Sequence, residues 1–408
     1  MSLLRFLTAG ESHGKALVGI LEGVPSGLSI SAEDIDRDLK RRQLGYGRGA
    51  RMKIESDHVT ILTGVRWGKT IGSPIALYIE NKDWKNWIEG MSTDSADGNS
   101  LPAVTKPRPG HADLAGAIKY DQHDLRNILE RSSARETAVR VALGAIAKNF
   151  LKEFGMTIGS YIIQIGKIKF NQSKKILRSS EKLLLSLFEK AEKSSVRCPD
   201  EEISGKMVEL ISKATQERNS LGGIFEVFVT GVPIGLGSHI QWDKKLDGRL
   251  AKALMGIQAI KGVEIGLGFD MARHLGSEVM DEIFYRAKSS EQRAQSNGSQ
   301  VSGFYRKTNN AGGIEGGMTN GMPIIIRIAM KPIPTLKKPL RSVDIMTKKP
   351  VEATYERSDI CAVPAAGVIG EAMVALTIAD VFLEKFGGDS MIETKRNYES
   401  YFEYIRKW

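Results

Sequence analysis

The stretch that decides the fold is Arg131-Ser132-Ser133-Ala134-Arg135-Glu136-Thr137, which runs directly into the almost wholly apolar residues 138–150. Ser133 with Glu136 three residues later is a capping-box pattern, so the spacing predicts a helix that begins here. Only two charged residues interrupt the apolar run. A helix that is apolar on all sides is normally buried on all sides, and we therefore expect this helix in the centre of the protein.

The start of this helix also carries two arginines, Arg131 and Arg135, beside two serines. Free N–H groups and the positive dipole end of a helix attract anions, and two guanidinium groups would strengthen a phosphate or carboxylate site there. The alternative interpretation is a capped core helix with a surface salt bridge. We favour the anion site, because two cations at the positive end of a helix repel each other unless an anion lies between them.

A second apolar run, residues 369–382, follows Arg357-Ser-Asp-Ile-Cys-Ala-Val-Pro364 much as the first follows Arg131. This echo suggests a weak internal repeat in which each half places one helix in the centre. Strand patterns occur at residues 3–8, 58–80, 156–170, 224–232 and 323–330. They show no regular βαβ alternation, so we expect an α+β fold in layers rather than a doubly wound sheet.

Length and composition indicate a large cytoplasmic enzyme or binding protein. We expect residues 1–408 to form one domain, with two lysine-rich amphipathic helices at about 173–219 lying at its periphery without a chemical role. The formal net charge of +10 favours acidic ligands such as phosphates, carboxylates or nucleic acid. Two cysteines suggest a reducing compartment. We find no signal peptide and no apolar run close to the ~20 residues of a membrane span.

Two of the six histidines lie in loops that expose them. His13 follows Glu11 and Ser12 in a glycine-flanked turn, and His111 follows Pro109-Gly110. Catalytic residues concentrate in such loops, and histidine is the natural proton carrier near neutral pH. We expect structural or surface roles for the remaining histidines, which are His58, His123, His239 and His274. Zinc-site spacings, a complete dinucleotide fingerprint and a Walker loop are all missing from the sequence, so we expect no metal.

The cations outside the first helix also cluster at turns and helix entries rather than at helical spacing. Such cations are Arg42, Arg48, Arg51, Lys331, Arg341 and Arg357. A charge run is usually a solvated face, but one multi-anionic ligand, or two, would explain this set better.

Six segments, in the same order along residues 1–385, resemble the signatures of the chorismate synthase family. They are Gly10-Glu-Ser-His-Gly14, Arg41-Arg-Gln-Leu-Gly-Tyr-Gly-Arg48, Arg108-Pro-Gly-His-Ala-Asp113, Arg131-Ser-Ser-Ala-Arg-Glu-Thr137, Gly256-Ile-Gln-Ala-Ile-Lys-Gly262 and Arg357-Ser-Asp-Ile-Cys-Ala-Val-Pro364. The resemblance implies a lyase of the shikimate pathway. It would eliminate phosphate and a ring proton from 5-enolpyruvylshikimate 3-phosphate, by anti-1,4-elimination, to give chorismate for aromatic amino acid biosynthesis.

The resemblance also implies the fold, the cofactor and the assembly. It implies a β-α-β sandwich with central buried helices between antiparallel sheets, and a homotetramer. It implies reduced FMN as a cofactor that is used without net redox change. Because the chain shows no added flavin-reductase domain, we expect an external flavin reductase to supply the reduced flavin.

Site residues carry over from the family by position. His13 is expected to protonate the leaving phosphate, His111 to protonate the reduced flavin near N1, and Asp359 to help the flavin N5 accept the ring proton. Flavin-site positions match Arg131, Ser132, Ser133, Gln258, Ala259, Gly316, Lys331, Pro332, Ile333, Pro334, Thr335 and Arg357. Positions for NADP match Arg42 and Arg48, which makes NADP(H) a candidate reductant of the flavin. The residues that suit the substrate anions are Ser12, Arg48, Arg135 and Arg341. Arg48 therefore has two open assignments, NADP and the substrate.

Two other functions remain as alternatives. A basic RNA- or DNA-binding protein would explain the net charge and the glycine-arginine loop, but not a buried helix with anion-binding residues at its start, and aromatic stacking motifs are missing. We therefore expect no nucleic acid partner and no membrane. A flavin-dependent oxidoreductase is the second alternative, and it would consume NADPH stoichiometrically.

Overall fold

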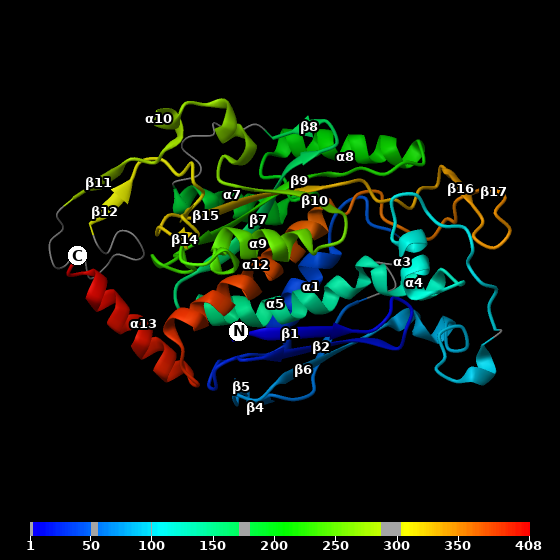
Figure 1. The fold of residues 1–408 in the computed structure, drawn as a ribbon, viewed down its shortest axis with the longest axis horizontal. Coiled ribbons are helices and arrows are strands. Elements are labelled where there is room, and N and C mark those ends of the chain that lie inside the picture. The colour runs from blue at the N-terminus through cyan, green and yellow to red at the C-terminus, as the bar shows by residue number, and fades with distance from the viewer. Residues whose placement is uncertain (1–2, 50–55, 99, 171–179, 287–302) are drawn as a thin grey trace.

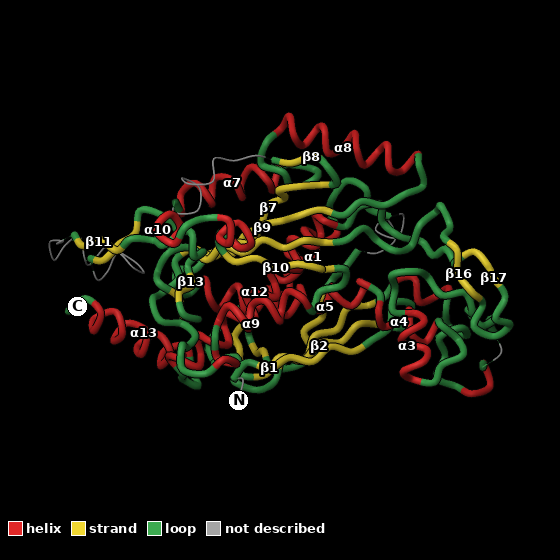
Figure 2. Tube along the Cα trace, turned by 45° about the horizontal axis from the view of Figure 1, so that its top comes forward, coloured by secondary structure: helices red, strands yellow, loops and turns green. Residues whose placement is uncertain are grey.

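The computed structural model describes residues 3–49, 56–98, 100–170, 180–286 and 303–408. Two antiparallel sheets enclose a layer of helices (Figures 1 and 2). The first sheet has the order β1-β2-β6-β3 and the second the order β10-β15-β9-β7-β8. The expected β-α-β sandwich of the α+β class is therefore confirmed.

Most strands of the two sheets fall within or beside the predicted strand segments, but β10 Ile260–Ile265 has no counterpart among them. The first sheet contains β1 Arg5–Ala9, β2 Ala16–Glu22, β3 Val59–Ile61 and β6 Ile75–Glu80. The second contains β7 Thr157–Ile165, β8 Ile168–Lys169, β9 Gly223–Thr230, β10 Ile260–Ile265 and β15 Ile324–Met330. The hairpins are β4 Val65–Arg66 with β5 Lys69–Thr70, β11 Ile283–Tyr285 with β12 Phe304–Arg306, β13 Ile314–Glu315 with β14 Met318–Thr319, and β16 Arg341–Val343 with β17 Pro350–Glu352.

The central layer consists of α1 Ala32–Gln43, α5 Thr137–Lys152 and α12 Val363–Phe386. The other α-helices are α3 Asp113–Tyr120, α4 Arg126–Ser132, α7 Glu181–Lys193, α8 Glu201–Gln216, α9 Leu246–Met255, α10 Gly276–Val279 and α13 Met391–Ile405. Short 3-10 turns are η1 Lys82–Asn86, η2 Ser95–Asp97, η3 Ala134–Glu136, η4 Trp242–Lys244 and η5 Gly268–Arg273.

Small residues let α5 pack closely against its neighbours. A Cβ on Gly144 would lie 2.3 Å from the Cβ of Ala372 on α12, and a Cβ on Gly19 of β2 would lie 2.5 Å from Cγ2 of Val139. Neither contact tolerates a side chain, so glycine at these positions sets the separation between α5, α12 and the first sheet. The two apolar helices thus lie together in the centre, as their sequences predicted.

The start of α5 differs from the expected capping box. Ser133 is extended (φ −61°, ψ 140°) and accepts a hydrogen bond from Arg135 N at 3.3 Å, and the turn η3 separates it from α5. The carboxylate of Glu136 pairs with Arg140 Nη2 at 2.7 Å and accepts from Gln258 Nε2 at 2.6 Å. Glu136 therefore ties α5 to another loop instead of capping the helix.

The second apolar helix is longer than expected. It begins at Val363, with Pro364 in its first turn, where proline is tolerated because its missing N–H would be unpaired anyway. By length and composition α12 could cross a membrane, contrary to the expectation that no apolar run is long enough, but 94% of its most apolar window is buried inside the protein. It is a core helix of the sandwich.

The peripheral helices lie as expected within the part of the chain that is described, although residues 173–179 of the predicted segment lie outside it. Leu184 and Leu187 of α7 pack against Tyr161 and Phe228 on the outer face of the second sheet. At the C-terminus, α13 packs on its own chain, because Tyr398 stacks its edge on Phe154. The N-terminal segment is tied to α12, since the N–H groups of Leu3 and Leu4 both donate to Asp380 Oδ1 at 2.9 Å.

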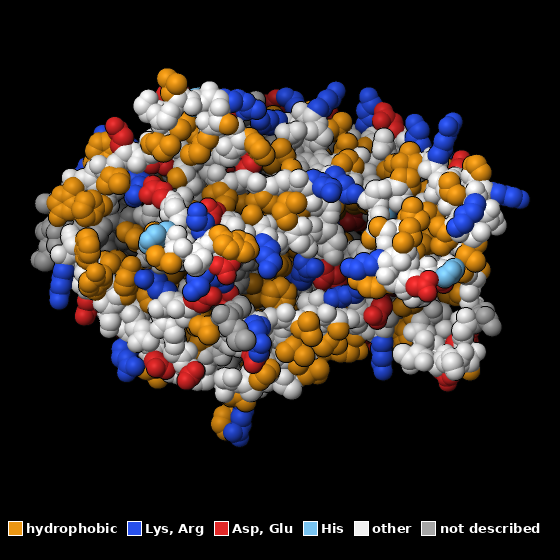
Figure 3. Space-filling model, viewed as in Figure 1, with side chains coloured by type: hydrophobic (Ala, Val, Ile, Leu, Met, Phe, Trp, Pro, Cys, Tyr) orange, Lys and Arg blue, Asp and Glu red, His pale blue; other side chains and the backbone are white. Residues whose placement is uncertain are grey.

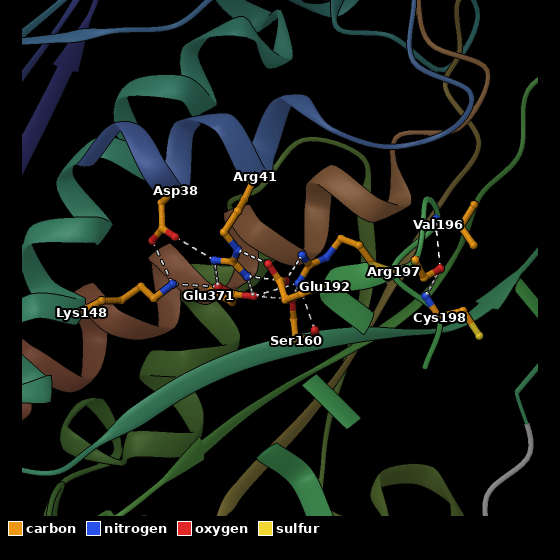
Figure 4. A network of polar contacts seen from close by, with 10 residues as sticks. Asp38, Arg41, Lys148, Ser160, Glu192, Val196, Arg197, Cys198 and Glu371 are labelled. Atoms are coloured by element: carbon orange, nitrogen blue, oxygen red, sulfur yellow. Dashed lines mark hydrogen bonds and ion pairs between the residues drawn. The ribbon is translucent and has the colours of Figure 1, made fainter. Parts of the chain in front are cut away.

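A buried ion cluster joins the central helices (Figure 4). Glu371, in the middle of apolar α12, is fully buried and pairs with Arg41 of α1 at 2.8 Å and Lys148 of α5 at 2.9 Å. It also pairs at 3.2 Å with Arg197, from the segment between α7 and α8 that we expected to be purely peripheral. Burial would raise the pKa of Glu371, but the three cations outweigh burial and hold the pKa well below its usual value.

This cluster generates a stability prediction. In Glu371→Gln, the carboxylates that remain paired with Arg41, Lys148 and Arg197 among the described residues would be those of Asp38 and Glu192. An unbalanced buried charge costs about 3–5 kcal/mol, so we expect a loss of this size in urea-induced unfolding.

The matched control is Glu384→Gln on the same helix, which removes a more exposed ion pair with Arg249 and should cost less than about 1 kcal/mol. Equal losses for the two variants would contradict the importance of the cluster.

Candidate active site

A cavity of about 560 Å³ opens where loops from both sheets meet the N-terminal ends of α5 and α12. Its size lies within the ~300–1,000 Å³ typical of small-molecule sites. Ala362, Ala365, Ala366 and Ile369 of α12 line an apolar part of its wall. Figure 3 shows this face, with a recess right of centre and Lys and Arg side chains around it.

Most of the predicted site residues line this cavity. From the sequence predictions it brings together Ser12, His13, Arg42, Arg48, His111, Ser132, Ser133, Arg135, Gln258, Ala259, Lys331, Ile333, Pro334, Thr335, Arg357 and Asp359. The lining cations are Arg42, Arg48, Arg108, Arg135, Lys331 and Arg357, and the lining carboxylates are Glu356 and Asp359. The wall therefore carries an excess of positive charge, as a site for anions requires.

Two buried arginines share one carboxylate at the head of α5. Arg135 Nη1 lies 2.5 Å from Asp57 Oδ1, and Arg42 Nη1 lies 3.2 Å from Asp57 Oδ2. Burial lowers the pKa of Arg42 to about 10, with Asp57 opposing the shift and Arg135 and Arg48 adding to it. Arg42 is still protonated at neutral pH. Two guanidinium groups therefore lie beside one shared carboxylate at the edge of the cavity.

Arg48 and Asp359 form a second charged pair in the wall. Arg48 Nη1 lies 2.9 Å from Asp359 Oδ2, and Gly49 N donates to Asp359 Oδ1 at 2.6 Å. The glycine loop after α1 is thereby fixed to the segment that leads into α12. Close packing requires glycine at Gly47, which has a φ of +87° and whose Cβ would lie 2.8 Å from Ile211.

His13 is held on two sides. Its Nδ1 lies 2.7 Å from Glu130 Oε1, and its backbone N donates to Glu130 Oε2 at 2.7 Å. Trp87 stacks on the imidazole with ring centroids 4.3 Å apart. Trp87 comes from the irregular segment 81–110, and that segment therefore contributes to the site.

His111 belongs to a different charged group. Its Nδ1 lies 2.6 Å from Asp113 Oδ1, and the same nitrogen is 3.1 Å from Arg108 Nη2. Arg108 also donates to Asp113 through its backbone N and Nε, and to Thr335 Oγ1 at 3.0 Å. Burial would raise the pKa of Asp113, but His111 and Arg108 hold it well below its usual value.

One wall offers hydrogen-bonding groups to a planar ligand. Gln258 Nε2 is committed to Glu136, and its buried Oε1 has no hydrogen-bond partner within the described residues. Ala259 has a φ of +65° and its carbonyl accepts from Lys331 N at 2.9 Å, which joins the loop after α9 to the loop after β15. A buried acceptor without a partner is costly, so this wall suits a ligand that donates an N–H.

Four predicted residues lie outside the cavity lining, namely Arg131, Gly316, Pro332 and Arg341. Arg131 lies in the last turn of α4, and its guanidinium donates to Thr8 O at 2.8 Å and to Gly10 O at 2.9 Å. The prediction of an anion site between Arg131 and Arg135 is therefore wrong. Extended Ser133 places the two arginines in different helical turns. Gly316 sits in the β13–β14 turn, and Arg341 is exposed on β16.

Several residues of the site escaped sequence reasoning. Asp57, Asn81, Trp87, Arg108 and Glu130 each contact a predicted residue, and only Arg108 lay in a recognised motif. Asp57 and Glu130 meet their partners across 78 and 117 positions. No local spacing reports a contact of that kind.

Comparisons with known proteins identify the family of the chain. The family model described as "Chorismate synthase" matches residues 4–383. The chain is 56% identical over 406 residues to a chorismate synthase of Aquifex aeolicus (strain VF5), with 99% of both chains covered. It is 56% identical over 404 residues to one of Geobacter sulfurreducens, covering 99% of this chain and 100% of that one.

A solved structure described as "Crystal Structure of Chorismate Synthase" is 46% identical and superposes with a TM-score of 0.79, covering 99% of both chains. The chain belongs to the chorismate synthase family. It is a lyase of aromatic biosynthesis that converts 5-enolpyruvylshikimate 3-phosphate into chorismate in a flavin-dependent reaction. Among the described residues, no group of His, Cys, Asp and Glu side chains is placed to hold a metal ion.

The depressed pKa of Asp113 predicts a pH-dependent contribution to stability. Because its folded pKa lies below the unfolded value of about 3.9, the contribution is complete above that pH and is lost as the pH falls through the folded pKa. Asp113→Asn should therefore cost about 2–3 kcal/mol of unfolding free energy at pH 7. The difference from the unsubstituted protein should shrink below about pH 4.

Urea unfolding of both proteins at pH 7, 5 and 3 measures this difference. Exposed Asp243→Asn is the control and should show no comparable change with pH. A difference for Asp113→Asn that stayed constant from pH 7 to pH 3 would show that Asp113 does not stabilise the fold through its charge.

Proposed function

We propose that the cavity binds reduced FMN and 5-enolpyruvylshikimate 3-phosphate together, and that catalysis needs the flavin without net oxidation or reduction. The observation that carries this proposal is the convergence of six cations, two histidines and an apolar helix wall in one cavity. The substrate has one phosphate and two carboxylates, and FMN has a further phosphate. A site for both ligands needs about this number of positive groups.

The anions divide between two parts of the wall. Arg42, Arg48 and Arg135 all line the cavity near the head of α5, and we assign the substrate phosphate and carboxylates to this group. An NADP phosphate is the alternative ligand for Arg42 and Arg48. Gly316 and Arg341 remain predicted ligands outside the cavity lining of this chain.

The other part of the wall suits a flavin. Gln258 Oε1 is a buried acceptor that a flavin ring N–H would satisfy, and Ser132, Ser133, Ala259, Arg357 and residues 331–335 would surround the ring and its phosphate. When bound, reduced flavin supplies an electron that weakens the C–O bond and takes it back as the ring proton leaves.

The residues of the chain then manage the protons of the elimination. The C–O bond to phosphate breaks with its electrons on oxygen, a ring C–H bond breaks, and a new C=C bond forms. We assign His13 as the acid that gives a proton to the departing phosphate, as a group with a near-neutral pKa can do. With FMN bound, His111 would keep a proton available to the reduced flavin, and Asp359 would assist the flavin in accepting the ring proton.

Further features support the assembly and setting that we propose, a cytoplasmic homotetramer supplied by an external flavin reductase. The outer face of the first sheet exposes Leu7 and Ile20, which pair across β1 and β2. Apolar patches of this kind are typical of subunit interfaces. Cys198 and Cys361 are buried free thiols, as in proteins of reducing compartments.

The decisive experiment is anaerobic incubation with dithionite-reduced FMN and 5-enolpyruvylshikimate 3-phosphate. We expect chorismate and inorganic phosphate in equal amounts, with no NADPH needed once the flavin is reduced. Stoichiometric NADPH consumption per turnover would instead identify an oxidoreductase. Product formation without any flavin would remove the cofactor from the proposal.

The histidine roles are tested by His13→Ala and His111→Ala. Loss of a positioned proton donor lowers turnover by about 10²–10⁴-fold, and we expect a loss in this range for each variant. Reduced FMN should still bind, because both variants keep Gln258 and Ala259 of the wall assigned to the ring. Flavin titration checks binding, and near-full turnover by either variant would show that its assigned role is wrong.

A further inference from the structure

Glu130 is a buried carboxylate that contacts His13, one of the two histidines that line the cavity. It lies on α4, with only 1% of its side chain exposed. Both oxygens are used by one residue, since Oε1 lies 2.7 Å from His13 Nδ1 and Oε2 accepts from His13 N at 2.7 Å. The carbonyl of Glu130 also accepts from Ser12 N at 3.0 Å. The turn that presents His13 is therefore attached to α4 at three points.

These contacts constrain the proton on the imidazole. An ionised carboxylate can only accept hydrogen bonds, so a neutral His13 must keep its hydrogen on Nδ1. The nitrogen that exchanges a proton with a ligand is then Nε2.

The second cavity histidine lacks this constraint. His111 Nδ1 lies near an acceptor, Asp113 at 2.6 Å, and near a donor, Arg108 at 3.1 Å. Its contacts therefore do not dictate one tautomer. Asp113 also pairs with Arg108 at 2.8 Å, whereas Glu130 pairs with His13 and with no Lys or Arg side chain of the described residues. The negative charge of Glu130 thus acts on His13 rather than on a permanent cation.

We propose that Glu130 is a positioning residue for His13, which fixes the Nδ1–H tautomer and the orientation of the imidazole so that Nε2 is the nitrogen that transfers a proton to the departing phosphate oxygen. This inference rests on the proposed role of His13. After the transfer, the neutral ring retains its Nδ1–H bond to Glu130, and the carboxylate stays anionic throughout. Trp87, stacked on one face of the ring, limits its rotation in the same orientation.

The test is a double-mutant cycle with Glu130→Gln, His13→Ala and the double variant, assayed with reduced FMN under anaerobic conditions. Gln has the size of Glu, but its amide cannot accept from Nδ1–H and His13 N–H with both ends. We expect Glu130→Gln to lower kcat by about 10²-fold with KM changed less than about threefold. If Glu130 acts through His13, the double variant should be no slower than His13→Ala alone.

A charge-dependent measurement separates positioning from simple support of the fold. In Glu130→Gln, the pH profile of kcat should differ from that of the unsubstituted enzyme, because the variant removes a carboxylate 2.7 Å from His13 Nδ1. Glu130→Asp keeps the carboxylate on a shorter stem and should retain the pH profile of the unsubstituted enzyme at reduced kcat. Reduced-FMN affinity should be unchanged in all variants.

The outcomes separate this inference from the proposed function. Near-full activity of Glu130→Gln, or an unchanged pH profile, would overturn the role of Glu130 while leaving His13 intact. A double variant slowed below His13→Ala by the full Glu130→Gln factor would show that Glu130 acts independently of His13. Near-full activity of His13→Ala would overturn the proposed acid itself, whatever Glu130→Gln does.

Discussion

The structure depends on one electrostatic constraint, that a charge taken out of water must have an opposite charge within hydrogen-bonding distance. Apolar helices α5 and α12 fill the centre, and the charged groups around their heads and flanks have very little solvent. Glu371 meets this constraint with three cations, and Asp57 meets it with two arginines. The same constraint therefore governs both the core and the wall of the cavity.

The two charged regions are linked through α1. Arg41 and Arg42 are adjacent on this helix, and Arg41 pairs with Glu371 while Arg42 reaches Asp57 beside the cavity. Residues one position apart on a helix point about 100° apart, so one helix can serve two regions. The core cluster thus fixes the rotation of α1 and, with it, the direction of an arginine that lines the site.

The sequence predicted those features that depend on local spacing. The apolar runs identified α5 and α12 as central helices, and glycine-flanked loops pointed to His13 and His111. Features that depend on distant contacts were not predictable. Glu130 looks like an ordinary helical acid, and Arg197 like a solvated loop residue, until folding brings them to His13 and Glu371. Arg131 shows that a strong local motif can also mislead. Its side chain donates to Gly10 O, and the extended Ser133 places Arg131 and Arg135 in different helical turns.

The attachment of the first residues to Asp380 has a consequence for synthesis on the ribosome. Strand β1 closes one edge of the first sheet, yet the N–H groups beside it are bound by a residue near the end of the chain. Helix α12, which separates the two sheets, ends at Phe386 of 408 residues. Both sheets are therefore synthesised before the helix that lies between them, and contacts of very long sequence separation form only after α12 has been made. Until then, the sheet faces that α12 covers stay exposed, and exposed apolar faces favour aggregation.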